Sequence, residues 1–213
     1  NILMEIPVND WDITTSALPH ETTEIFKDFK TVDTGLRHGT LTVIINHKPF
    51  EVTTFRIAGE YDDNRHPETV EFTIDIENDL ARRDFTVNAI AYSKTHGIVD
   101  LYGGRDDIYN SIIKTVGNPD KRFEEDGLRI MRALRFSATL GFKIEEETAK
   151  AIHRNKDLLR NISAERIAIE LTKLICGKNA FNILMEYPDV LSVFIPEIES
   201  AVNFTQYGEK HAY

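Results

Sequence analysis

The sequence contains a single cysteine, Cys176, among its 213 residues. It therefore forms neither an intrachain disulfide bond nor a metal site built from several cysteines. Long hydrophobic runs are also missing, because none reaches the roughly 18 to 20 residues that a membrane helix needs. The N-terminal stretch lacks the charged and apolar regions of a secretory signal. These absences predict a reducing, cytoplasmic setting and no membrane partner.

Basic residues are in deficit, since 25 Lys and Arg against 35 Asp and Glu give a formal net charge of −10. As an average, this charge speaks against a nucleic-acid partner, because phosphate binding needs cations. The acidic excess, however, lies within residues 1–80, whereas residues 81–213 contain acidic and basic residues in equal number. The sequence thus indicates an acidic module suited to a divalent metal, followed by an Arg-rich module.

Hydrophobic periodicity changes in the same region as the charge. Two β-branched runs flank residues 46–49 and predict a hairpin with a short loop, and further short strands are expected at residues 11–14, 90–93 and 96–102. From Lys121 onward, apolar residues recur at helical spacing. We therefore expect an α+β fold with a mixed sheet in the first part and an all-helical second part.

The chain also contains a candidate hinge and looks incomplete. Gly103 and Gly104 mark a tight turn near the change from strands to helices, where a hinge could sit. The sequence starts at Asn1 and stops at Tyr213 without terminal signals. We expect it to be a fragment of a longer protein.

Asp10 and Asp12 form the sharpest chemical feature. On a strand, the period of two directs both carboxylates to one face, with Trp11 on the other. Such a pair repels unless a cation lies between its members, and hard oxygen ligands suit Mg²⁺. A pair of this kind fits two-metal phosphoryl chemistry. Taken alone, the motif is weak, because a bare pair of this kind is more often two exposed loop acids.

Glu51 is a candidate third carboxylate. It lies in an apolar run that predicts a strand, on the face opposite Phe50 and Val52. From a strand beside Asp12 it would complete a metal site. The alternative is an ordinary solvated strand residue.

The run at residues 82–89 combines two guanidiniums, an acid and an amide, namely Arg82, Arg83, Asp84 and Asn88. Arginine pairs with phosphate or with the acceptor edges of bases, whereas Asp and Asn can hydrogen-bond ribose hydroxyls. Without context, the same run could be a salt-bridged surface turn.

Charged residues recur every three positions in residues 124–136, at Asp126, Arg129, Arg132 and Arg135. On one helix they would form a single polar stripe beside an apolar one. A solvated helix face is the simpler interpretation. The sharper one uses hydrogen-bond polarity, because an Asp that accepts and an Arg that donates complement cytosine and adenine but mismatch uracil and guanine.

Seven segments, in this order, together resemble the class II tRNA nucleotidyltransferases, the bacterial-type CCA-adding enzymes that share a family with bacterial poly(A) polymerases. The segments are residues 10–12, 37–40, 51–56, 82–89, 100–104, 124–136 and 163–170. The resemblance covers nearly the whole chain. It implies a polymerase-β-like head at residues 1–115, a helical neck at 116–178 and the start of a helical body at 179–213.

The resemblance also implies a role for each candidate residue. Asp10 and Asp12 match the catalytic Mg²⁺ ligands, and Glu51 matches the third carboxylate. The ribose-sensing motif matches Arg82, Arg83, Asp84 and Asn88. The amino-acid template for C and A matches Asp126 and Arg129, and neck arginines near the nucleotide match Arg132 and Arg135. Glu165, Arg166 and Glu170 match a motif that suggests helix packing more than chemistry.

The activity implied is transfer of CMP and AMP from CTP and ATP to the 3′ end of tRNA, with Mg²⁺ as cofactor and pyrophosphate released. Residues 58–70 resemble a flexible loop that CC-adding specialists lack, which disfavours a CC-only enzyme. The glycine loop that family members carry before the paired aspartates is not in this sequence. An A-adding specialist, a poly(A) polymerase and an inactive RNA-binding scaffold stay open as alternatives.

Overall fold

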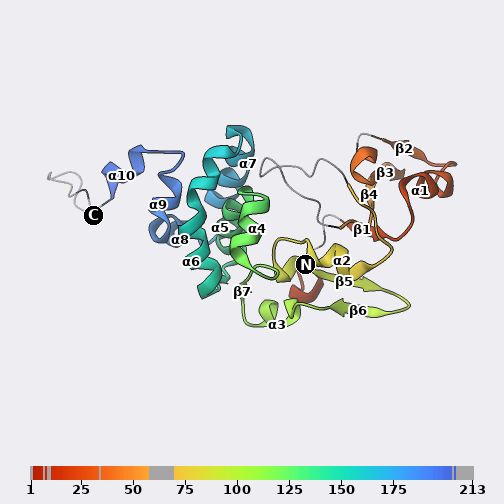
Figure 1. The fold of residues 1–213 in the computed structure, drawn as a ribbon, viewed down its shortest axis with the longest axis horizontal. Helices are drawn as coiled ribbons and strands as arrows, with labels where there is room; N and C mark the ends of the chain where they lie inside the picture. Colours follow the sequence, from red (N-terminus) through yellow and green to blue (C-terminus); the bar gives the residue numbers. More distant parts are fainter. Residues whose placement is uncertain are drawn as a thin grey trace. The chain divides into compact units, whose positions relative to one another are not determined.

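The computed structural model describes residues 2–6, 8, 11–33, 35–57, 70–202 and 204 (Figure 1). The chain divides into two compact units. The first unit comprises Asn1–Asn110 with Lys114–Gly117, and the second comprises Ser111–Ile113 with Asn118–Tyr213. No helix in the described ranges has the length and apolar character needed to cross a membrane. The chain is of the α+β class, as its sequence predicts.

A four-stranded mixed sheet forms the N-terminal part of the first unit. Its order is β1-β4-β3-β2, with β1 at Asp12–Thr15, β4 at Lys48–Thr54, β3 at Thr40–Ile45 and β2 at Lys30–Val32. β1 runs parallel to β4, whereas the other neighbours are antiparallel. Asn46 and His47 link β3 to β4 with φ of 50° and 64°, which suits the tight two-residue turn of a twisted hairpin. The predicted hairpin is confirmed.

One face of this sheet is buried and the other is polar. Leu41, Val43 and Val52 form a hydrophobic cluster against which Phe26 packs. Helix α1, at Pro19–Ile25, ends just before Phe26 and contacts β3 and β4. Since side chains alternate along a strand, the residues between these apolar positions face the opposite side. Glu51 on β4 is one of these residues.

The rest of the first unit contains short α-helices, 3₁₀ helices and a β-hairpin. Its remaining elements are η1 at Ile2–Met4, η2 at Leu36–His38, α2 at Ile76–Ala81, η3 at Thr86–Asn88, β5 at Ile90–Ser93, β6 at Gly97–Asp100 and α3 at Gly104–Tyr109. β5 and β6 pair antiparallel, which confirms the strands expected there. Phe85 and Ala89 are buried, so the motif at residues 82–89 is anchored by its apolar members.

The second unit is helical apart from one two-stranded sheet. Its elements are α4 at Pro119–Glu125, α5 at Leu128–Leu140, α6 at Glu146–Asn155, η4 at Lys156–Asn161, α7 at Ala164–Ile175, α8 at Ala180–Glu186, α9 at Pro188–Leu191 and α10 at Glu197–Ala201. β7, at Ile112–Ile113, pairs parallel with β8, at Lys143–Ile144. Helix α5 contacts α4, α7 and α8, and its Ile130, Met131 and Leu134 are fully buried. The second half is mainly helical, as predicted, and differs from the all-helical expectation by the two-residue strand β8.

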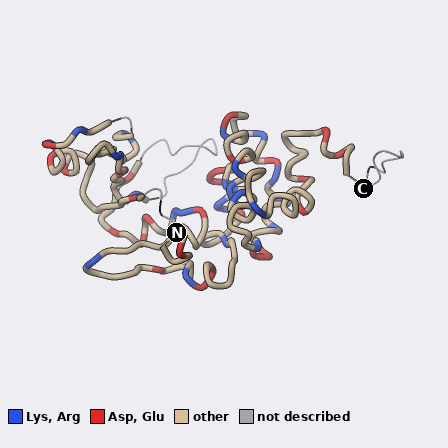
Figure 2. Tube along the Cα trace, turned by 180° about the vertical axis from the view of Figure 1, so that it is seen from behind, with Lys and Arg blue, Asp and Glu red and all other residues tan. Residues whose placement is uncertain are grey.

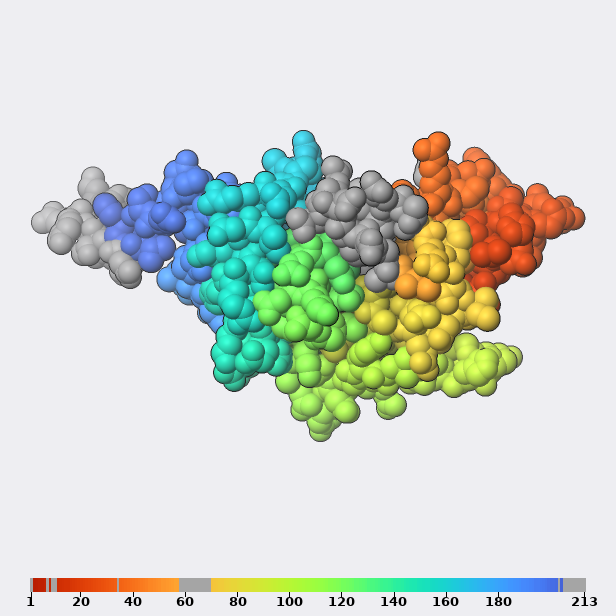
Figure 3. Space-filling view, viewed as in Figure 1, coloured from red at the N-terminus to blue at the C-terminus, as the bar shows by residue number. Residues whose placement is uncertain are grey.

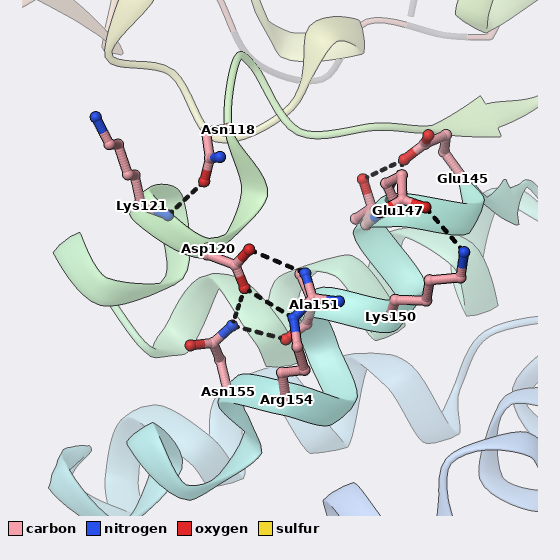
Figure 4. A network of polar contacts seen from close by, with 10 residues as sticks. Asn118, Asp120, Lys121, Glu145, Glu147, Lys150, Ala151, Arg154 and Asn155 are labelled. Carbon is pink, nitrogen blue, oxygen red and sulfur yellow. Dashed lines mark hydrogen bonds and ion pairs between the residues drawn. The ribbon is translucent and has the colours of Figure 1, made fainter.

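A polar network joins α4 to α6. The carboxylate of Asp120 accepts hydrogen bonds from Arg154 Nη2 at 2.9 Å and from Asn155 Nδ2 at 2.6 Å (Figure 4). Asn118 caps α4 by accepting from the Lys121 N–H, and Glu145 caps α6 by accepting from the Thr148 N–H. The space-filling view shows α4 and α6 in direct contact (Figure 3). Capping groups satisfy the backbone N–H groups that a helix start leaves without partners.

The helix predicted over residues 124–136 is interrupted in the structure. Asp126 does not lie on the same helix as Arg129, because α4 ends at Glu125 and Asp126 is extended, with φ −151° and ψ 105°. Instead, Asp126 Oδ1 accepts from the Leu128 N–H at 3.0 Å, at the first residue of α5. The predicted stripe on α5 therefore begins at Arg129, and Asp126 occupies the break before it.

Candidate nucleotide-binding and metal site

Asp12 and Glu51 are direct neighbours across the parallel pair of β1 and β4. Facing residues of paired strands lie on the same side of a sheet, and both side chains here are exposed. Two adjacent carboxylates supply the hard oxygen ligands that Mg²⁺ prefers, so the donor set fits the expected ion. Asp10 lies outside the described residues, and among those described no three His, Cys, Asp or Glu side chains gather into a metal-binding group.

A cavity of about 680 Å³ in the first unit is lined by Asp12, Arg83 and Asn88. Apolar side chains form much of its wall, among them Ile13 and Ile90. Sites for small ligands commonly combine an apolar wall with a few convergent polar groups. The cavity thus brings together three residues from two separate sequence motifs.

Asp79 holds the two arginines of the motif at residues 82–89. Its side chain is fully buried, and its oxygens accept from Arg82 Nη2 at 2.6 Å and from Arg83 Nη2 at 2.9 Å. The backbone N–H of Arg56 also donates to it, at 3.2 Å. Burial alone raises the pKa of Asp79, but the charges and hydrogen bonds of Arg82 and Arg83 outweigh burial and lower it below its usual value. A charged carboxylate therefore fixes both guanidiniums.

Asp79 is not among the residues that the sequence predicts for the site. An acid in the helical segment before the arginines is typical of a solvated helix face. A usable signal was its spacing, because Asp79 precedes Arg82 by three residues and Arg83 by four, which is the spacing of ion pairs along a helix.

Asp84 and Asn88 interact with each other. Asp84 Oδ1 accepts from the Phe85 N–H at 2.8 Å and from Asn88 Nδ2 at 3.0 Å. Asp84 is buried, so its carboxylate orients the Asn88 amide at the cavity wall. Of the four residues that the resemblance assigns to ribose sensing, Arg83 and Asn88 line the cavity.

The turn at Gly103 and Gly104 is packed against the same motif. Gly103 has φ +71°, which confirms the predicted tight turn, and the Asp100 carboxylate accepts from the Gly104 and Arg105 N–H groups. A Cβ atom on Gly104 would lie only 2.2 Å from the Thr86 carbonyl oxygen. Such close packing of Gly104 on η3 makes this turn an anchor for the motif and does not favour a hinge.

In the second unit, Glu125 binds two arginines. Its carboxylate lies 2.7 Å from Arg122 Nη2 and 2.6 Å from Arg129 Nη1. Arg129 Nη1 also donates to the Arg122 carbonyl oxygen at 3.1 Å. These bonds orient the Arg129 guanidinium at the start of α5.

Helix α7 supplies charges opposite to those at Asp126 and along α5. Arg166 Nη2 donates to Asp126 Oδ2 at 2.9 Å, and Glu170 accepts from Arg135 Nε at 2.5 Å. Arg132 lies farther from Glu170, at 4.0 Å. Acidic and basic residues accordingly alternate over the helices of this unit (Figure 2). The Arg135 guanidinium, which also lies 3.8 Å from the centre of the Phe136 ring, is engaged in packing α5 against α7.

The predicted residues thus fall into two groups. In the first unit, Asp12 lies beside Glu51 and shares a cavity with Arg83 and Asn88, whereas Arg82 is bound to Asp79. In the second unit, the Asp126 and Arg129 side chains are each held by a partner. Residues 58–69, which contain most of the expected flexible loop, lie outside the described residues.

Comparison with known proteins identifies a family. Residues 1–114 match the family described as the poly A polymerase head domain, and residues 141–202 match a probable RNA and SrmB-binding site of polymerase A. The CCA-adding enzyme of Ligilactobacillus salivarius is 48% identical over 88% of this chain and 46% of its own length. That of Enterococcus faecalis is 49% identical over 83% of this chain and 43% of its own length.

Similarity extends to a solved structure. The Bacillus stearothermophilus CCA-adding enzyme in complex with CTP is 44% identical to this chain, with a TM-score of 0.80 over 88% of this chain and 45% of that one. The chain spans less than half the length of the curated relatives named above.

Proposed function

This chain belongs to the poly A polymerase head domain family, and from that premise we propose that it is part of an enzyme that adds CMP and AMP from CTP and ATP to the 3′ end of tRNA. The observation that carries the proposal is the pairing of Asp12 with Glu51 beside the cavity that Arg83 and Asn88 also line. This arrangement unites carboxylates for a metal, a guanidinium for phosphate and an amide for a sugar hydroxyl. The names of the relatives support the choice of reaction.

Asp10, Asp12 and Glu51 are the proposed acidic centre, with Asp10 and Asp12 holding Mg²⁺. Bound magnesium would supply positive charge for the attacking hydroxyl and the leaving pyrophosphate. Arg82 and Arg83 belong to the proposed ribose-sensing motif, and Arg83 also reaches the base, because a guanidinium donates to acceptor edges and to phosphate oxygens. Asp84 and Asn88 orient the ribose, and the Asp84 carboxylate fixes the Asn88 amide that donates to it.

Base selection is assigned to Asp126 and Arg129. A carboxylate that accepts and a guanidinium that donates complement the amino group and ring nitrogen of cytosine and adenine, whereas uracil and guanine meet them with the opposite polarity. A buried polar mismatch costs about 1–3 kcal/mol, which is enough to discriminate bases without a nucleic-acid template. Arg132 and Arg135 are proposed to lie near the nucleotide, with Arg135 also bound to Glu170.

The same proposal divides the chain into a nucleotidyltransferase head at residues 1–115, a helical neck at 116–178 and the start of a body at 179–213. It locates the protein in the cytoplasm, where tRNA is its partner. A reducing compartment agrees with the single cysteine of the sequence.

An incorporation assay on the full-length protein tests this function. The substrates are a tRNA that ends at the discriminator base, Mg²⁺, and each labelled triphosphate singly and in combination. Addition of two C and one A is expected. Addition of A alone, only to tRNA already ending in CC, would indicate an A-adding specialist, and long A tails on general RNA would indicate a poly(A) polymerase. Binding of tRNA without incorporation would support an inactive scaffold.

The metal assignment makes a separate prediction. Replacing Asp10 and Asp12 together by Ala is expected to abolish transfer, because no paired carboxylates remain to hold Mg²⁺, and Glu51→Gln is expected to weaken it. Circular dichroism should show an unchanged fold, since Asp12 and Glu51 are exposed. Glu24→Gln is the matched control, because this exposed acid lies on α1 and pairs with Lys27. Full transfer by the double variant would refute the metal assignment.

A further inference from the structure

The Asp126 carboxylate is held at both oxygens by donors from two different elements. Oδ1 accepts from the backbone N–H of Leu128 at 3.0 Å. Oδ2 accepts from Arg166 Nη2, on α7, at 2.9 Å. Two donors on one carboxylate determine the plane of the group as well as its position. Each oxygen still has capacity for a second donor, so these bonds leave room for a base amino group.

Arg166 does not stabilise its own helix, α7. It lies in the first turn of α7, where Ser163 occupies the N-cap position. Backbone N–H groups give a helix start a partial positive charge, so a cation there is unfavourable. The ion pair with Asp126 compensates for this unfavourable position. Arg166 is therefore explained by its contact with Asp126 and not by the stability of α7.

The ion pair also uses only part of the guanidinium. Nη2 binds Asp126, while Nη1 is buried and has no hydrogen-bond partner among the described residues. A pair built only for stability gains most from two parallel hydrogen bonds to one carboxylate. The single contact here sets the direction of Oδ2 and leaves a buried donor beside it.

Helix α7 is itself fixed against α5. Glu170, one turn after Arg166, is buried and binds Arg135 on α5. Ile167 and Leu174 on the same helix are buried as well. Arg166 therefore projects from a rigid support, as a residue that orients another side chain requires.

We propose that Arg166 is a positioning residue for base selection: from α7, it holds the Asp126 carboxylate in the orientation that accepts the amino group of cytosine or adenine. The proposal rests on the proposed function and extends it to a segment that the sequence assigns to helix packing. Without Arg166, the carboxylate keeps only the Leu128 N–H and can rotate. It still accepts hydrogen bonds, but it is no longer aligned with the amino group, so its advantage over the carbonyl of uracil or guanine falls.

The test compares Arg166→Ala and Arg166→Lys with Arg154→Ala in the full-length protein. Arg154 is the matched control, because its pair with Asp120 also joins two helices of the second unit at 2.9 Å. The measured quantities are kcat/KM for CTP against UTP and for ATP against GTP on tRNA, together with the thermal midpoint. Discrimination by Arg166→Ala should fall about tenfold, equivalent to about 1.4 kcal/mol. Arg166→Lys should retain most of it, because an ammonium still donates to one oxygen. Arg154→Ala should discriminate like the wild type.

Unchanged discrimination in Arg166→Ala, or an equal loss in Arg154→Ala, would overturn the proposal. If Arg166→Ala does not fold, Arg166→Met, which keeps the aliphatic stem and lacks the donors, gives the same test. A wild-type protein that adds neither CMP nor AMP to tRNA overturns the proposed function and this inference together. A selective wild type with an equally selective Arg166 variant overturns the inference alone.

Discussion

Asp79 carries a full negative charge in a buried position, where it binds the guanidiniums of Arg82 and Arg83. We predict that Asp79→Asn lowers the free energy of unfolding at pH 7 by about 3 kcal/mol, because it leaves two arginines beside a neutral amide. Denaturant titration measures the change. The substitution should also raise KM for the triphosphate, since it releases the Arg83 side chain at the cavity wall.

The pH dependence of this effect has a definite sign. The pKa of Asp79 in the folded protein lies below its usual value of 3.8. The ion pairs therefore stabilise the fold fully above that value and lose their contribution as the pH falls through the lowered pKa. The stability difference between wild type and Asp79→Asn should accordingly stay constant near neutral pH and shrink as the pH falls below 3.8. Glu77→Gln, an exposed acid on the same helix, is the control. Equal stability of Asp79→Asn and wild type at pH 7 would contradict the prediction.

Motif chemistry could identify the polar residues of the cavity but not what holds them. Arg83 and Asn88 were recognisable because guanidinium and amide groups in one short run suit a nucleotide. Asp79 was not, since nothing in its neighbourhood shows that its carboxylate is buried. The partner of Asp126 was equally hidden, because Arg166 lies 40 residues away along the chain. Burial and long-range pairing depend on packing that a single sequence does not display.

The start of α3 depends on two glycines that serve different purposes. Gly103 has φ +71°, and a Cβ added there would meet no atom of the described residues within 4 Å. A Cβ on Gly104, by contrast, would lie 2.2 Å from the Thr86 carbonyl oxygen. We predict that Gly103→Ala costs about 1 kcal/mol through backbone strain alone. Gly104→Ala should cost about 3 kcal/mol, because η3 or α3 must shift to relieve the clash.

Denaturant unfolding and nucleotide affinity separate the two glycine variants. Gly104→Ala should weaken nucleotide binding, since a shift of η3 moves Asn88, which lines the cavity. Gly103→Ala should bind nucleotide normally. Equal effects of the two substitutions on both measurements would show that the close approach of Gly104 to Thr86 has no role in holding the motif.

Periodicity predicted the helices and strands better than their ends. The hairpin at residues 46–49 and the strands at 90–93 and 97–100 follow directly from apolar alternation and turn residues. The break at Asp126 did not, because residues 124–136 read as one amphipathic helix. At this break Asp126 is extended, and its carboxylate pairs with Arg166, 40 residues farther along the chain. A contact so distant in sequence leaves no periodic signal.

The two compact units exchange short segments at residues 111–117, which neither charge nor periodicity indicates. Ser111–Ile113 belongs to the second unit although Lys114–Gly117, which follows it, belongs to the first. The cause is the pairing of Ile112 and Ile113 with Lys143 and Ile144. A strand of two residues carries no periodic signal, so a single sequence cannot indicate this exchange of segments.

The second unit contains a cavity with lysines in its wall, in contrast to the acidic first part of the chain. A cavity of about 700 Å³ is lined by Lys143, Lys178, Asn179 and Asn182, within the residues that match the RNA-binding family. Both lysines are exposed. Such cations bind phosphates and release counterions, so we predict that Lys143→Ala with Lys178→Ala weakens tRNA binding at low salt.

The salt dependence of that binding distinguishes phosphate contacts from a general loss of charge. Each lost phosphate contact should reduce the slope of log K against log salt by about 0.7 to 0.9, so the double variant should lose up to roughly twice that amount. Lys150→Ala is the matched control, because Lys150 already pairs with Glu146 and Glu147 and has less charge to offer a phosphate. A slope equal to that of the wild type in the double variant would exclude the cavity as a phosphate site, since contacts that release no counterions cannot be contacts with the RNA backbone.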